Sequence, residues 1–118
     1  MVDTDRREAE VLAVRPLADA VEIDLHVPPD LFWFRGHFPG VPILPGVVQI
    51  DWAIAMACRH FAADLSAGRA LRVKFRSVIQ PDERVTLALR HVTGKKAVAF
   101  EYRRDGEVCS SGQVGAEP

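Results

Sequence analysis

A histidine and a carboxylate, His37 and Asp51, stand fourteen residues apart in the middle of this chain. The segment between them is first rich in Pro and Gly and then almost wholly apolar. A neutral imidazole accepts a proton near neutral pH, and a desolvated carboxylic acid donates one. Because an apolar helix has little structural use for a buried Asp, the sequence predicts an acid–base pair made by these two residues.

A stiff loop and a long helix would position this pair. Pro39 and Pro42 restrict the loop that carries the histidine. The Pro-Gly pair at 45–46 suits the start of a helix, and the apolar run that ends at Phe61 predicts about 16 helical residues, roughly 24 Å in length. A helix that is apolar on nearly every face is expected to be buried.

Alternation of apolar and polar residues predicts strands on both sides of this helix, because side chains of a strand point to opposite faces in turn. The predicted strands cover 9–14, 21–27, 71–76, 85–90, 98–102 and 107–114. Asp105-Gly106 is a strong signal for a hairpin between the last two. The sum is an α+β fold in which one central helix is wrapped by an antiparallel sheet of about five strands.

Composition places the chain among ordinary globular proteins. It has 118 residues, of which 48% are hydrophobic and 26% charged, and a net charge of -1. We therefore expect one domain over 1–118, without a bias toward nucleic acid or membrane. The charged start of the chain and two cysteines without disulfide or metal spacing favour a reducing, cytoplasmic location. No metal site is indicated for the histidines outside the loop.

The segments 36–40 and 42–46, with an acid fourteen residues after the histidine, resemble the active-site signature of beta-hydroxyacyl-acyl-carrier-protein dehydratases of the FabA/FabZ type. The acid is an Asp, as in the FabA branch, and Ala55 stands where both branches have a Gln. Gln49, two residues before the acid, resembles a feature of a shorter subgroup, the stand-alone dehydratases linked to aryl polyene and similar specialised pathways. The resemblance implies a hotdog fold.

The resemblance also implies a reaction that needs no cofactor. His37 would remove the C2 proton of a 3-hydroxyacyl thioester carried by acyl carrier protein, and Asp51 would protonate the departing C3 hydroxyl. The product would be the trans-2-enoyl thioester. Gly46 either simply allows the turn into the helix or exposes a backbone N–H that binds the thioester carbonyl as negative charge develops there.

Two further groups of residues have both a structural and a functional interpretation. The aromatic residues Phe34, Phe38 and Trp52 belong either to the core or to a tunnel for the acyl chain. A basic stripe on one predicted strand is either solvated surface or a docking site for an acidic acyl carrier protein. That stripe consists of Arg72, Lys74 and Arg76.

One sheet can cover only one side of an apolar helix, so the sequence predicts a partner for the other side. The resemblance implies a homodimer, or a dimer of dimers, in which His37 of one chain faces Asp51 of the other. Two other functions remain open. A hotdog thioesterase would use an acid to activate water, and a weakly active subunit would only bind acyl chains.

Overall fold

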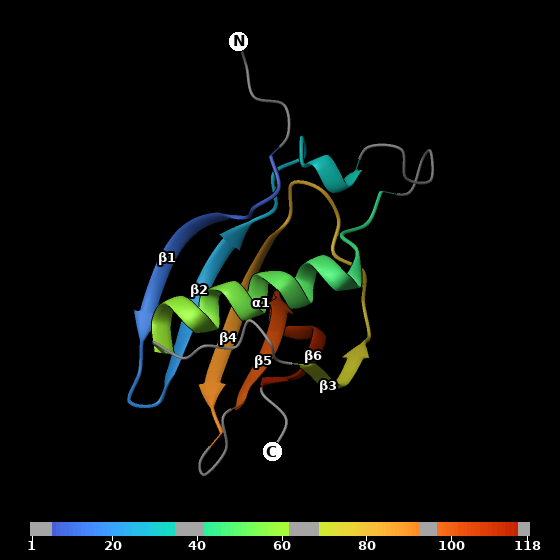
Figure 1. The fold of residues 1–118 in the computed structure, drawn as a ribbon. Coiled ribbons are helices and arrows are strands. Elements are labelled where there is room, and N and C mark those ends of the chain that lie inside the picture. Colours follow the sequence, from blue (N-terminus) through green and yellow to red (C-terminus); the bar gives the residue numbers. More distant parts are fainter. Residues whose placement is uncertain (1–5, 35–41, 62–68, 93–96, 116–118) are drawn as a thin grey trace.

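A computed structural model describes residues 6–34, 42–61, 69–92 and 97–115 of the chain. It contains one α-helix, one short 3-10 helix and six strands (Figure 1). In chain order these are β1 (Glu10–Pro16), β2 (Ala20–His26), η1 (Phe32–Phe34), α1 (Gly46–Phe61), β3 (Arg69–Phe75), β4 (Arg84–His91), β5 (Ala97–Arg104) and β6 (Glu107–Gly115).

The strands form one antiparallel sheet in the order β1-β2-β4-β5-β6-β3, and α1 lies across one face of it (Figure 1). The predicted helix and every predicted strand are present, and the strand count is six rather than about five. The hairpin at Asp105-Gly106 is confirmed, with both residues at positive φ (53° and 81°). The fold is therefore the expected hotdog arrangement.

The core lies between α1 and the central strands. Alternate residues of β2, β4 and β5 point toward the helix, and the side chains of β2 are buried at every second position. The helix contributes its own buried apolar residues, which pack into the same cluster. On α1 these are Val48, Trp52, Ala53, Met56 and Ala57. The residues that recur with a period of 2 in the strands and of 3.6 in the helix therefore pack together in one layer.

The other face of α1 is exposed, which corrects one expectation from the sequence. Val47 is 63% exposed, and Asp51, Ala55 and Arg59 are exposed at intervals of four residues along the same face. Residues at this spacing form one stripe on a helix. The helix is thus not buried all round, and Asp51 is not buried within a single chain. No helix within the described ranges is long and apolar enough to cross a membrane.

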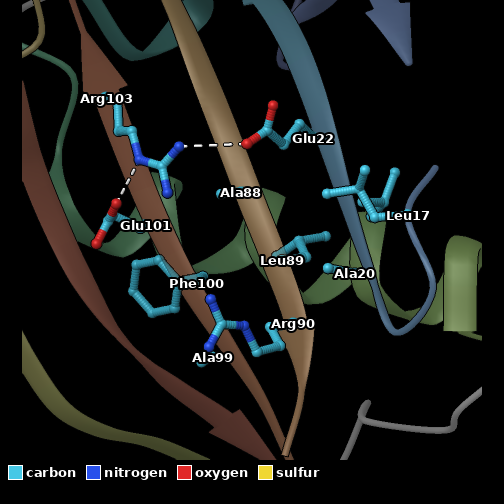
Figure 2. Close-up of a pocket in the computed structure, with 11 residues that line it drawn as sticks. Leu17, Ala20, Glu22, Ala88, Leu89, Arg90, Ala99, Phe100, Glu101 and Arg103 are labelled. Carbon is cyan, nitrogen blue, oxygen red and sulfur yellow. Dashed lines mark hydrogen bonds and ion pairs between the residues drawn. The ribbon is translucent and has the colours of Figure 1, made fainter. Parts of the chain in front are cut away.

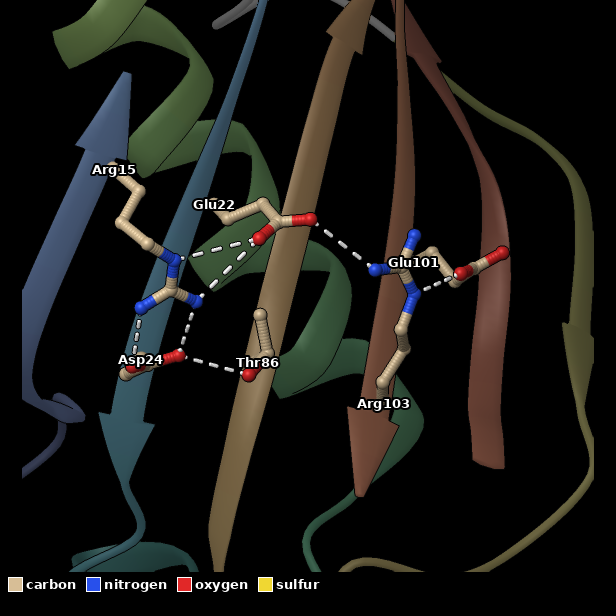
Figure 3. Close-up of polar contacts among 6 residues, drawn as sticks. All are labelled: Arg15, Glu22, Asp24, Thr86, Glu101 and Arg103. Carbon is tan, nitrogen blue, oxygen red and sulfur yellow. Dashed lines mark hydrogen bonds and ion pairs between the residues drawn. The ribbon is translucent and has the colours of Figure 1, made fainter. Parts of the chain in front are cut away.

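Charged side chains join four strands on the sheet face opposite α1 (Figure 3). Arg15 of β1 binds both carboxylate oxygens of Asp24 on β2, at 2.6 and 2.8 Å, and also approaches Glu22. Asp24 accepts a further bond from the Thr86 hydroxyl of β4 at 2.8 Å. These bonds from Arg15 and then Thr86 lower the pKa of Asp24 to about 2. Glu22 also pairs with Arg103 of β5.

His26 links the edge strand to the turn before β4. Its Nδ1 lies 3.0 Å from Glu10 of β1, and its Nε2 lies 2.7 Å from Asp82. Ionised carboxylates only accept hydrogen bonds, so both contacts are satisfied at once only by the doubly protonated imidazolium. The hydrogen bond to Asp82, and then that to Glu10, accordingly raises the pKa of His26.

This arrangement predicts that the fold loses stability as the medium becomes alkaline. Because the folded-state pKa of His26 is raised, its contribution is complete below the unfolded value of about 6.5 and is lost as pH rises through the folded value. We expect the fall in Tm from about pH 6 to about pH 9 to be smaller in His26→Gln than in the wild type. His91→Gln, at an exposed histidine, is the control and should keep the wild-type pH dependence. Equal pH dependence in His26→Gln and wild type would contradict the assignment.

Candidate active site

The described part of the candidate site lies at the amino end of α1. Gly46 is the first helical residue, and Asp51 follows in the second turn. His37 and Phe38 lie outside the described residues, so the distance between His37 and Asp51 stays open. Asp51 projects from the exposed stripe of the helix rather than into the core. The described part of the site therefore consists of one exposed carboxylate and the amino end of the helix.

The peptide unit between Pro45 and Gly46 is aligned with the start of α1. The Pro45 carbonyl accepts hydrogen bonds from the amides of Val48 and Gln49, at 3.1 and 3.2 Å. That carbonyl therefore points into the helix, and the N–H of Gly46 in the same peptide unit points out of it. Among the described residues no acceptor takes up the Gly46 amide. A free donor at the positive end of the helix dipole suits an oxygen that gains negative charge.

A cleft of about 260 Å³ lies beside Gly46, between the start of α1 and the segment after β3. Its walls are mainly apolar, and Phe75 at its edge is 53% exposed. The cleft is lined by Ile43, Leu44, Gly46, Gln49, Phe75, Arg76, Ser77 and Val78. A group bound there would lie next to the free end of the helix.

Gly46 leaves room for the side chain above it. A Cβ atom added at this position would lie 2.5 Å from Cζ of the Phe75 ring, which is closer than carbon atoms approach in proteins. Gly46 is not among the described glycines at positive φ, so the turn into the helix does not by itself need a glycine. The absence of a side chain makes room for an aromatic ring.

Sequence reasoning did not identify Phe75 as a site residue. The alternation in β3 predicted that Phe75 points inward with Val73, but Val73 is half-buried and Phe75 is largely exposed. The register between β3 and β6 shifts between Leu71 and Lys74, and Arg72 adopts a positive φ of 55°. This bulge interrupts the period of 2 and allows Phe75 to lie over the helix terminus.

The same bulge affects the predicted basic stripe. Arg72, Lys74 and Arg76 are all exposed, as expected for either interpretation. They do not follow one regular strand face, because the bulge lies between the first two and β3 ends at Phe75. Arg76 lies on the rim of the cleft beside Gly46. Docking of a carrier protein on these residues stays a prediction.

The described aromatic residues of the predicted tunnel have packing roles. Trp52 is 6% exposed, and its indole N–H donates to the Arg7 carbonyl at 3.0 Å. Phe34 is partly buried against the core. These contacts account for both residues structurally, and a contribution to a tunnel stays a prediction.

A second hollow of about 250 Å³ lies on the outer face of the sheet (Figure 2). Ala88 and Ala99 leave space there between larger side chains, and Arg103 along its edge donates to both Glu22 and Glu101. The hollow is separated from Gly46 and Asp51 by the sheet. The carboxylates that line this hollow are paired with Arg103, so they do not resemble the acid on α1, which is exposed.

Comparison with known proteins gives a consistent result. The family described as ApeI-like, ApeI dehydratase, matches residues 14–113. A solved structure, the dehydratase heterocomplex ApeI:P from Xenorhabdus doucetiae, is 31% identical with a TM-score of 0.81 and covers 92% of this chain and 96% of that one. An uncharacterized protein from Erwinia carotovora subsp. atroseptica is 34% identical with a TM-score of 0.75, covering 94% and 97% of the two chains.

Curated relatives have the same kind of name. The 3-hydroxyacyl-[acyl-carrier-protein] dehydratase FabZ of Sorangium cellulosum is 32% identical over 94 residues, which are 70% of this chain and 61% of that protein. The chain spans between 51% and 61% of the length of the curated relatives that it matches. The similarity is therefore to part of those proteins.

The contact between Gly46 and Phe75 can be tested by a double-mutant cycle. We expect Gly46→Ala to lower the Tm, because the new methyl group must displace the ring, and to do so much less in a Phe75→Ala background. A coupling free energy of about 1 kcal/mol from thermal unfolding would be typical of residues in contact. The matched control is Gly112→Ala, whose Cβ would approach Phe100 and Val73 instead. Its effect should add to that of Phe75→Ala, and additivity for Gly46→Ala as well would refute the contact.

Proposed function

The chain belongs to the ApeI-like dehydratase family, and from this premise we propose that it converts a 3-hydroxyacyl thioester to the trans-2-enoyl thioester and water. The observation that carries the proposal is the family match over 14–113, which includes both His37 and the helix with Asp51. The hotdog fold shared with the Xenorhabdus doucetiae heterocomplex supports it.

In the proposed reaction, His37 takes the C2 proton and the electron pair of that C–H bond forms the C2–C3 double bond. The C3–O bond breaks, and Asp51 supplies the proton with which the hydroxyl leaves as water. Negative charge gathers on the thioester oxygen as the C2 proton departs. In this proposal the amide of Gly46 donates a hydrogen bond to this oxygen, which would lower the barrier to proton removal.

We further propose that the acyl chain arrives on acyl carrier protein. The curated relatives are named as dehydratases of acyl-carrier-protein substrates. The exposed cations Arg72, Lys74 and Arg76 would attract the acidic surface of such a carrier or its phosphate group. Because Arg76 is on the rim of the cleft beside Gly46, a thioester delivered there would approach the free helix amide.

The active form that we propose is a homodimer with two shared sites. The exposed stripe of α1 carries Asp51 itself, so a second chain that covers the stripe would also remove water from this carboxylate. The cleft residues Phe75 and Val78, both about half exposed, offer further apolar surface to a partner, and β3 is the last strand at its end of the sheet. The partner chain would then provide the histidine that faces Asp51, in agreement with the family resemblance.

The catalytic roles predict a large loss of activity on single substitution. We expect purified protein to form the enoyl product from a 3-hydroxyacyl thioester, measured by enone absorbance or mass. His37→Ala and Asp51→Asn should each reduce the rate about 100-fold or more, the usual effect of a positioned acid or base. His60→Ala, at an exposed histidine of the same helix, is the control and should retain wild-type activity.

Near-normal dehydration by either variant would remove that residue from the mechanism. Release of free thiol without an enoyl product would instead support the thioesterase.

The shared site predicts complementation between two inactive variants. When His37→Ala and Asp51→Asn chains are mixed equally and exchange subunits, half of the dimers are mixed and each contains one intact site. About a quarter of the wild-type activity should then return. Different tags on the two variants allow the mixed dimer to be counted by native mass spectrometry. Mixed dimers that recover nothing would show that the site is not shared, and a stable monomer in sedimentation would refute the assembly.

A further inference from the structure

Gln49 makes an unusual set of contacts for a residue on the buried face of a helix. It is 3% exposed and, with Ser110, is one of two buried polar residues in the described part of the chain. Its Nε2 donates to the Leu44 carbonyl at 3.2 Å, and its Oε1 accepts from the Ser110 hydroxyl at 2.6 Å. Its backbone carbonyl also accepts from the Tyr102 hydroxyl at 2.7 Å.

These contacts fix the segment that leads into α1. The Leu44 amide donates to the Ile79 carbonyl at 2.7 Å, and the Leu44 carbonyl receives the Gln49 side chain. The two peptide groups of Leu44 are therefore held from opposite sides, by the turn after β3 and by the helix. Pro45 follows with a restricted φ, so little freedom remains before the peptide unit that contains the Gly46 amide.

We propose that Gln49 is a positioning residue that holds the Leu44 peptide and thereby orients the Gly46 amide toward the thioester oxygen. The thioester substrate in this proposal comes from the proposed function. The positioning of the Leu44 peptide comes only from contacts within the chain. Donors that stabilise a developing charge must be aligned before the reaction, and a displacement of about 1 Å can cost up to 100-fold in rate.

A purely structural role would leave a different signature. Any loss of a buried hydrogen bond lowers stability, so Tm alone cannot distinguish the two roles. Tyr102→Phe is the matched control, because it removes one buried hydrogen bond to the same residue without touching Leu44. Gln49→Met keeps the approximate size of the side chain and removes both of its hydrogen bonds.

The first measurement is independent of catalysis. We expect Gln49→Met to accelerate hydrogen exchange of the Leu44 amide and to shift the NMR resonance of the Gly46 amide, whereas Tyr102→Phe changes neither beyond its effect on global stability. If Gln49→Met and Tyr102→Phe behave alike at these two amides, the proposal is overturned whether or not the protein is a dehydratase.

The second measurement uses dehydration kinetics well below the Tm of each variant. Gln49→Met should lower kcat about tenfold with KM changed less than about twofold, and Tyr102→Phe should leave kcat within about twofold of the wild type. Relative to the wild type at the same pH, Gln49→Glu should have near-normal kcat at low pH, where the neutral acid donates to Leu44, and a lower ratio as pH rises. An active wild type whose kcat is insensitive to Gln49→Met would show that Gln49 is only structural. A wild type without dehydratase activity would refute the proposed function and leave the exchange result to decide the geometry.

Discussion

Everything described above depends on the burial of one face of α1 against the sheet. The buried positions of the helix, among them Val48, Trp52 and Ala57, fix its rotation about its own axis. Once that rotation is fixed, Asp51 lies on the exposed face, in the stripe that also holds Val47 and Ala55. The apolar contacts that stabilise the fold are thus also what direct the carboxylate away from the sheet.

The polar contacts act on the position of the helix end rather than on its rotation. Leu44, Gln49 and Ser110 form a hydrogen-bonded buried group, and no described buried side-chain nitrogen or oxygen lacks a hydrogen-bond partner. Such satisfied networks specify one arrangement where apolar packing would tolerate several. The apolar contacts therefore fix the rotation of the helix, and the polar contacts fix the position of its amino end beside the cleft.

Much of the fold was predictable because its signals are local. The alternation in β2 and β4 survives in the structure, since those strands lie inside the sheet and present one face to the core. The prediction failed where position depends on more than the periodicity of one segment. Phe75 follows a bulge that the residue pattern of β3 does not predict. Its position depends on the space above Gly46, which belongs to another element. Asp51 was expected to be buried because its neighbours are apolar, yet those neighbours on its own face are exposed in the single chain. Residue type and spacing were enough to single out Asp51 as the candidate acid. They did not predict its exposure to solvent in the single chain.

Both edges of the sheet are irregular, and this limits how copies of the chain can aggregate. The register slips between Val11 and Ala13 on β1 and between Leu71 and Lys74 on β3, while the pairings of β2 with β4 and of β4 with β5 are continuous. A regular edge would be a template for endless strand addition, as in amyloid fibrils. Bulges on both edges shorten the stretch of backbone on which another strand can form. The chain can therefore display Val11, Leu12 and Val14 on an edge strand while the geometry of its backbone opposes growth into fibres.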